Sequence, residues 1–283
     1  MPASPLEVQF SDIEAWAEHY VLSSELSVKL APPPVPAQFR AGARPVRLER
    51  PGRPKELRLA RRGERTPKAE ALKEPHYRAR LLHAFWHHEL QAAELMCWAV
   101  LAFSDAEPEF RKGLIGICLD EIRHMNLYRA HIETLGEQLG SFGVRDWFWK
   151  RVPNCPTKVA FVALMGMGLE AANLEHATRF AALLREAGDE TAAQIQEQIG
   201  REELAHVRFG TRWFTRWTGG CDFDDWVSHL PPPLSPWVLK AEPLATEARL
   251  RAGMPESFLT ALHGYVPERK GRPLLASEPQ HDD

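Results

Sequence analysis

The stretch Glu121-Ile122-Arg123-His124 recurs later in the chain as Glu203-Leu204-Ala205-His206, and the two stretches together decide the expected fold. Each has a glutamate three residues before a histidine, within a segment that reads as a long helix. Successive residues of an α-helix turn by about 100°, so positions i and i+3 share one face. Each stretch can therefore aim a carboxylate and an imidazole at one point. A single such pair arises often by chance or as a surface ion pair, whereas two matched pairs favour a metal site.

Four long helices are predicted around these stretches. They cover residues 76–104, 108–135, 157–187 and 189–218. Glycines stand where three of these helices should stop, as expected at helix C-termini. The first and second helices, and the third and fourth, are separated by very short connections, so each pair should form an antiparallel hairpin. The link over 137–156 is long enough to run the length of the molecule. The prediction is an all-α four-helix bundle with one long crossover.

The two halves of this region look like copies of one unit, because each predicted hairpin begins with two acids five residues apart. The acids are Glu89 and Glu94 in the first half, and Glu170 and Glu175 in the second. Glu89 precedes Glu121 by 32 residues, and Glu170 precedes Glu203 by 33. Five residues turn a helix by about 500°, so the two acids of a pair cannot both face one site. The geometry of a hairpin tolerates either choice and leaves open which acids bind metal.

The apolar residues around these acids indicate that the carboxylates are buried and need metal ions as partners. Glu170 follows a run without charge over 159–169, and Glu89 lies among apolar residues. A carboxylate that is buried without a partner costs several kcal/mol, and converging carboxylates repel one another. Two divalent cations would neutralise them. Carboxylate and imidazole ligands suit iron or manganese, and the absence of thiolates disfavours zinc. The ligand set therefore predicts two ions of iron or manganese.

The pattern Glu89 … Glu121-x-x-His124 … Glu170 … Glu203-x-x-His206 resembles the ferritin-like di-iron carboxylate superfamily. That superfamily includes bacterioferritin, rubrerythrin, the radical-generating subunit of ribonucleotide reductase and a tRNA-modifying hydroxylase. Residues 87–94, His-His-Glu-Leu-Gln-Ala-Ala-Glu, resemble an uncharacterised bacterial family within it. The resemblance covers about residues 76–218. It favours Glu89 and Glu170 as metal ligands beside the two Glu-x-x-His pairs. It also implies that the site binds two iron ions, with manganese as the alternative, and that it reacts with oxygen or peroxide.

Glu94 and Glu175 are then expected either to orient a ligand histidine or to have a structural role, with direct ligation as the alternative. Other side chains near the expected site carry further predictions. Tyr128 stands one turn after His124, at the offset of a tyrosine in the ribonucleotide reductase radical subunit. It is a candidate catalytic residue, and a core aromatic is the alternative. Its counterpart in the second half is Gly210, which should leave space for a substrate. His131 is expected to be structural.

No specific function is predicted for the remaining histidines and cysteines near the site. His87, His88 and His176 flank the acids, and any one of them would be an additional ligand only as a minority alternative. Cys97 and Cys118 are expected to be small core residues.

Two arms flank the expected bundle. The domain prediction is residues 1–75 for an N-terminal helix and a Pro/Arg-rich arm, 76–220 for the bundle, and 221–283 for a C-terminal extension. The first helix is expected over 11–31 as an outer helix capped by Ser11 with Glu14. Residues 40–74 hold 12 Lys/Arg against 5 Glu. This arm should wrap the surface or be disordered. The alternative is a basic patch that binds an anionic substrate or RNA, and the lack of interleaved aromatics disfavours RNA.

Two short helices are expected in the C-terminal extension, over 222–230 and 254–263, with a mobile tail after 267. The whole chain has a net charge of −3 and 44% hydrophobic residues, the composition of a soluble globular protein. It has no apolar run of roughly 20 residues, as a membrane helix needs. The first residues show no basic and then apolar pattern of a secretory signal. The four cysteines have no C-x-x-C spacing, which predicts a reducing, cytoplasmic setting.

These features favour an oxygen-activating oxidase or hydroxylase. Its substrate would be an unknown small molecule or a modified nucleoside, and its reductant an external electron donor. We expect a monomer or dimer. A ferroxidase or peroxide-scavenging iron protein is the alternative, and a non-catalytic helical protein with a vestigial site is the remaining one.

Overall fold

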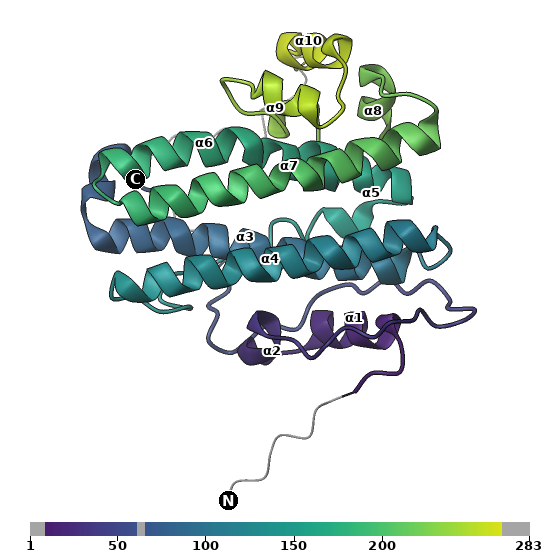
Figure 1. The fold of residues 1–283 in the computed structure, drawn as a ribbon, viewed down its shortest axis with the longest axis horizontal. Coiled ribbons are helices and arrows are strands. Elements are labelled where there is room, and N and C mark those ends of the chain that lie inside the picture. Colours follow the sequence, from purple (N-terminus) through teal and green to yellow (C-terminus); the bar gives the residue numbers. More distant parts are fainter. Residues whose placement is uncertain (1–8, 61–65, 268–283) are drawn as a thin grey trace, which may run out of the picture.

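The structure, a computed structural model, describes residues 9–60 and 66–267. Within these ranges it is helical, and the β-type contact there is an isolated bridge between Leu59 and Val144. The long helices are α3 (Pro75–Ala102), α4 (Pro108–Thr134), α6 (Glu170–Glu186) and α7 (Glu190–Thr218). Figure 1 shows that α3 and α4 form one pair, α6 and α7 a second, and that the two pairs stack on each other. The prediction of an all-helical chain is confirmed.

Local sequence sets where these helices begin and end. Proline occupies the first turn of α3 and of α4, where its missing N–H needs no partner. Asp189 caps α7 by accepting a hydrogen bond from the Ala192 N–H at 2.9 Å. Gly136, Gly188 and Gly219 lie just beyond α4, α6 and α7, with positive φ of 83°, 83° and 84°. The predicted C-terminal glycines are therefore confirmed.

The third predicted helix, over 157–187, is wrong in its middle. The chain there forms α5 (Lys158–Leu164), a π-helical turn η3 (Met165–Leu169) and then α6. Gly166 of η3 packs directly on Gly210 of α7, and a Cβ built on Gly166 would lie 2.6 Å from the Gly210 Cα. The expectation that Gly210 leaves room for a substrate is therefore wrong, because the backbone of η3 fills that space.

The first predicted helix is also corrected. Residues 11–31 form α1 (Ile13–Leu22) and α2 (Leu26–Leu30), separated by extended backbone at Ser23. Asp12, not Ser11, caps α1 by accepting from the Ala15 N–H at 2.9 Å. Glu14 instead accepts a hydrogen bond from the buried Arg111 of α4 at 2.6 Å. Helix α1 packs on α3 and buries its aromatic residues fully, so it belongs to the core although it lies outside the four long helices.

The described part of the Pro/Arg-rich arm wraps the surface of α3. The Trp98 indole N–H donates to the Leu48 carbonyl at 3.1 Å, and the Arg47 guanidinium lies over the Trp98 ring. The wrapping alternative is thus confirmed for residues 40–60. Residues 61–65 of the same arm lie outside the described residues.

Helices α8 (Phe223–His229), α9 (Thr246–Arg251) and α10 (Glu256–Gly264) cover the opposite side of the molecule, over α5, α6 and α7 (Figure 1). The two predicted short helices correspond to α8 and α10, whereas α9 was not predicted. The expected mobile tail after 267 lies outside the described residues. Short 3-10 turns complete the chain: η1 (Ala69–Lys73), η2 (Val152–Asn154) and η4 (Pro236–Val238). Within the described ranges, no helix has both the length and the apolar character that a membrane span requires.

Candidate metal centre

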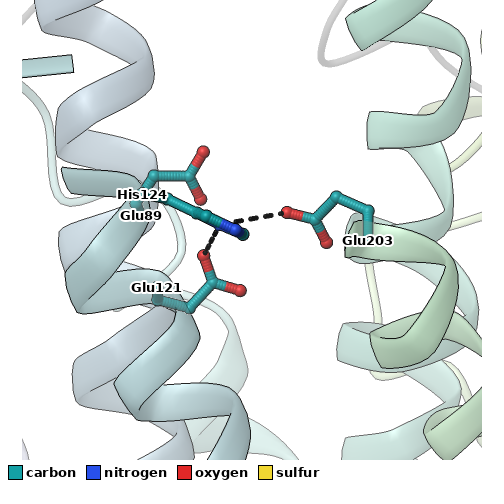
Figure 2. Close-up of side chains that lie close together, drawn as sticks. All are labelled: Glu89, Glu121, His124 and Glu203. Carbon is teal, nitrogen blue, oxygen red and sulfur yellow. Dashed lines mark hydrogen bonds and ion pairs between the residues drawn. The ribbon is translucent and has the colours of Figure 1, made fainter. Parts of the chain in front are cut away.

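Six acidic and histidine side chains from four helices converge between the two helix pairs. They are Glu89 of α3, Glu121 and His124 of α4, Glu170 of α6, and Glu203 and His206 of α7. Figure 2 shows three of them projecting from the α3–α4 pair toward Glu203 on the facing pair. None is more than 4% exposed. These are the six residues that the sequence predicted as metal ligands.

The six residues form two overlapping groups. Glu89 and His124 belong to one group, and Glu170 and His206 to the other. Glu121 and Glu203 belong to both. Within each group, one potential ligand atom per residue lies within 4.8 Å of the others. The arrangement therefore has the shape of two adjacent cation sites that share two carboxylates.

The histidine rings point one nitrogen at the carboxylates and the other outward. His124 Nδ1 lies 3.2 Å from Glu121 Oε2, and His206 Nδ1 lies 3.0 Å from both Glu203 Oε2 and Glu121 Oε1. On the outer side, His124 Nε2 lies 2.7 Å from Glu202 Oε2. His206 Nε2 lies 3.4 Å from an oxygen of Asp120. An outer carboxylate that accepts the Nε2 proton leaves the Nδ1 lone pair facing the centre, which is the form that binds a metal.

Asp120 and Glu202 were missed by the sequence analysis. Each directly precedes a glutamate of the centre, and each contacts the histidine of the other half. Arg123 joins them, donating to Asp120 at 2.8 Å and to Glu202 at 2.6 Å. The available signal was the doubled acid, Asp120-Glu121 and Glu202-Glu203. Helical spacing alone does not reveal a contact that crosses between α4 and α7.

Burial and mutual repulsion control the protonation of the centre. Burial raises the pKa of Glu89 and of Glu170 well above the usual range, and Glu121 and Glu203 raise both further. Burial also opposes ionisation of Glu121, but the two histidines outweigh it and hold the pKa of Glu121 well below its usual range. Burial lowers the pKa of His124, yet Glu121 and Glu203 raise it to about 9. The chain alone thus balances its buried negative charges with protons.

The donor atoms fit a cation. The Oε1 atoms of Glu170 and Glu203 are buried and have no hydrogen-bond partner among the described residues. Buried polar atoms are nearly always partnered, so such orphans need an explanation, and a bound ion is one. Four carboxylates with two imidazoles supply oxygen and nitrogen donors and no thiolate, a set that suits iron or manganese.

Glu94 and Glu175 lie outside both groups, because each has other partners. Glu94 Oε1 accepts from Arg53 at 2.6 Å and lies 2.8 Å from the fully buried Lys29 ammonium. Glu175 accepts two hydrogen bonds from Arg249, at 2.7 and 2.9 Å. These two acids therefore fasten the N-terminal arm and the C-terminal extension to the long helices.

The amino-acid sequence matches a known protein family. A family model described as "Protein of unknown function (DUF455)" matches residues 13–260. The chain belongs to this family. The match includes all six residues of the centre. A relative from Haemophilus influenzae, described as an uncharacterized protein, is 29% identical over 156 residues, which cover 52% of this chain and 54% of the relative. The chain thus matches about half the length of this curated relative. No solved structure matches the chain.

In this DUF455 chain, Tyr128 lies beside the centre. The Tyr128 hydroxyl accepts a hydrogen bond from the Gln196 amide at 2.8 Å, and burial together with Glu89 and Glu203 raises the phenol pKa well above its usual value. A cavity of about 20 Å³ adjoins both Tyr128 and Glu89. The sequence analysis did not identify Gln196.

The other histidines near the centre belong to neither group. His88 and His176 line the small cavity. His131 Nε2 lies 3.0 Å from Asp189, so its predicted structural role is supported. His87 Nε2 lies 3.3 Å from Asp146. The predicted core cysteines Cys97 and Cys118 are fully buried, with their sulfur atoms 3.4 Å apart.

Proposed function

We propose that the protein is a ferritin-like di-metal carboxylate oxidoreductase that activates dioxygen to oxidise a small organic molecule. The observation that carries the proposal is the pair of overlapping residue groups that share Glu121 and Glu203. In the proposed assignment these two glutamates would help to hold both of two metal ions. Glu89 with His124 would complete one ion's ligands, and Glu170 with His206 the other's.

Charge balance supports two divalent ions. The centre holds four glutamates and two histidines, all buried. Four ionised carboxylates with neutral imidazoles carry a charge that two divalent cations cancel. Without metal, protonated histidines and protonated Glu89 and Glu170 perform that role. Metal binding therefore exchanges protons for cations at nearly constant net charge, which is why so many carboxylates can converge in a buried site.

The surrounding residues orient the donors. Glu202 and Asp120 hold the outer nitrogens of His124 and His206, so both rings keep Nδ1 turned inward. Such outer carboxylates fix the tautomer and the ring orientation, and they typically strengthen metal binding 10- to 100-fold or so. When two iron or manganese ions are bound, the centre would supply electrons to dioxygen. Its burial beneath helices and arms excludes bulk water from the reaction.

Tyr128 is the proposed proton donor at the centre. Gln196 donates to its hydroxyl oxygen, which leaves the phenolic hydrogen free to point elsewhere. The raised pKa keeps that hydrogen in place at neutral pH. The adjoining cavity of about 20 Å³ has room for one molecule of the size of water or dioxygen. An organic substrate does not fit there and must approach from outside this cavity.

The proposed reaction inserts one oxygen atom into a C–H bond. Dioxygen, two protons, two electrons and R–H give R–OH and water, and the two electrons come from an external donor. The arms that cover the four long helices favour this chemistry over iron storage, because they enclose the centre instead of leaving the bare helices available for assembly into a shell. Iron or peroxide handling remains the competing function.

Isotope labelling tests the proposal. Iron-loaded protein is incubated with ¹⁸O₂, a chemical reductant and a small-molecule extract of cells, and the products are analysed by mass spectrometry. We expect ¹⁸O in an organic product, lost in the Glu121→Ala/Glu203→Ala variant and strongly reduced in Tyr128→Phe with its metal content unchanged. Oxygen uptake that needs no organic molecule and leaves iron as mineral would contradict the hydroxylase and favour iron handling.

A further inference from the structure

A second and larger pocket lies on the other side of His88 from the small cavity. It has a volume of about 200 Å³ between α3 and the chain segment that joins α4 to α5. Its lining residues come from two turns of α3 and from the joining segment. They are Arg80, His83, Ala84, His87, His88, Phe142, Gly143, Val144, Arg145 and Trp147. The volume suits a small organic molecule and greatly exceeds that of the cavity beside Tyr128.

The charged side chains among the described residues that line this pocket are Arg80 and Arg145, and none of these residues is acidic. Burial lowers the pKa of the three histidines in the lining, so they add hydrogen-bonding groups and no charge at neutral pH. Arg145 is exposed and forms no ion pair with the described residues. The neighbouring Asp146 does not neutralise it, because the Asp146 carboxylate accepts hydrogen bonds from Arg53 at 2.8 and 2.9 Å. A guanidinium with no carboxylate beside it is the usual partner of a carboxylate or phosphate ligand.

A buried imidazole in the pocket wall adds a second indication. The His87 side chain is only 3% exposed, and its Nδ1 has no hydrogen-bond partner among the described residues. Its Nε2 lies 3.3 Å from Asp146 but, like Nδ1, forms no hydrogen bond with the described residues. Buried side-chain polar atoms are rarely left unpaired, so a hydrogen-bonding group of a ligand would provide a partner for this ring.

Aromatic rings complete the lining. Phe142 is buried and packs edge-on against the His83 ring. Trp147 contributes a further large ring, and the His88 ring is stacked on Phe148 at 5.2 Å. Flat apolar walls beside cationic groups suit a ligand with a planar body and an anionic group. His88 also lines the cavity that contains Glu89, so one side chain separates the two spaces.

We propose that this pocket binds a planar organic anion, an aromatic carboxylate or phosphate, with its charge on Arg145 and its ring between Phe142 and Trp147. The binding itself stands on the pocket alone. That the bound anion is the substrate rests on the proposed function, since its ring would then lie next to His88 and the centre beyond it.

Binding to metal-free, full-length protein tests the inference independently of any reaction. Benzoate and phenyl phosphate are titrated by calorimetry, with benzamide as the neutral match of benzoate and inorganic phosphate as the ringless match of phenyl phosphate. Arg145→Gln removes the cation, and the exposed Arg212→Gln on α7 is its charge-matched control. Ala84→Leu fills the pocket from an exposed helical position, and Ala130→Leu on α4 is its control. Metal content is measured separately on each variant.

We expect at least one of the two aromatic anions to bind, and benzamide and inorganic phosphate to bind at least about tenfold more weakly. Arg145→Gln and Ala84→Leu should each weaken binding by about tenfold or more, while both controls leave it unchanged. The preferred anion distinguishes a carboxylate site from a phosphate site. No binding below about 10 mM, or binding that Arg145→Gln and Ala84→Leu leave intact, would overturn the proposal. If the unaltered protein binds no metal but shows this pattern of anion binding, only the proposed function is refuted.

Discussion

Glu170 and Glu175 stand five residues apart on α6 and should respond oppositely to neutralisation. Glu175 accepts from Arg249 Nε at 2.7 Å and Nη2 at 2.9 Å, and from the Ala245 N–H at 2.9 Å. The Arg249 guanidinium is fully buried. Glu175→Gln therefore leaves a buried cation without its carboxylate, whereas Glu170→Gln replaces an acid whose raised pKa already keeps it protonated in metal-free protein.

The size of the first effect follows from burial. Breaking a buried ion pair by removing one partner typically costs about 3–5 kcal/mol. For a domain of this size, that loss lowers the melting temperature by on the order of 10 °C. Glu170→Gln should change the metal-free protein by less than about 1 kcal/mol, because glutamine has nearly the shape of a protonated glutamate. Its effect should instead appear in metal content.

Urea unfolding of the metal-free proteins and elemental analysis of the iron-loaded ones measure the two effects. We expect Glu175→Gln to lose stability and keep its metal, and Glu170→Gln to lose metal and keep its stability. Glu175→Leu combined with Arg249→Met should recover most of the lost stability, because it removes both charges. The reasoning is refuted if Glu175→Gln loses metal while the metal-free protein stays as stable as the original.

Three further changes test other parts of the account. Gly210→Ala should destabilise the protein by about 1–3 kcal/mol or more in urea unfolding, since the new Cβ would lie 2.7 Å from backbone, whereas Gly116→Ala on the exposed face of α4 should stabilise it by about 1 kcal/mol. Burial lowers the pKa of His83 to about 4, so as the pH falls below 6.5 the unfolded chain takes up a proton before the folded chain does, and the free energy of unfolding drops by about 3 kcal/mol by pH 4. His83→Gln should remove that part of the decline. An unchanged dependence of the free energy of unfolding on pH would contradict this prediction. Glu202→Gln should weaken metal binding by roughly 10- to 100-fold in competition with a chelator, while Glu197→Gln, away from the histidines, should not; equal effects would exclude a role through His124.

Much of the centre could be predicted from the sequence because its information is local. Helical periodicity puts Glu121 with His124, and Glu203 with His206, on one face each. The matched spacing to Glu89 and Glu170 then relates the two halves. All six residues lie together in the structure. The choice between Glu89 and Glu94 was different, since both spacings fit a hairpin. It depends on Lys29 and Arg53, which reach Glu94 from an arm whose path no local pattern gives.

The errors in the sequence predictions arise from contacts between residues that lie far apart in the chain. The π-helical turn before Glu170 goes with a backbone contact between Gly166 and Gly210, residues far apart in sequence. Helical spacing made the Gly210 position look vacant, when another backbone occupies it. Asp120 and Glu202 act across α4 and α7, so their role depends on the packing of helices and not on spacing within one helix.

The iron content of the unaltered protein, of a single variant and of a double variant tests the central claim most directly. Protein loaded anaerobically with Fe²⁺ and freed of excess is analysed for iron per chain. The shared-ligand arrangement predicts about two irons per chain in the unaltered protein and about one in Glu89→Ala. It predicts less than about half an iron per chain in the Glu121→Ala/Glu203→Ala variant, because Glu121 and Glu203 belong to both groups. One iron or less in the unaltered protein, or a content that the Glu121→Ala/Glu203→Ala change leaves the same, would contradict a two-metal centre.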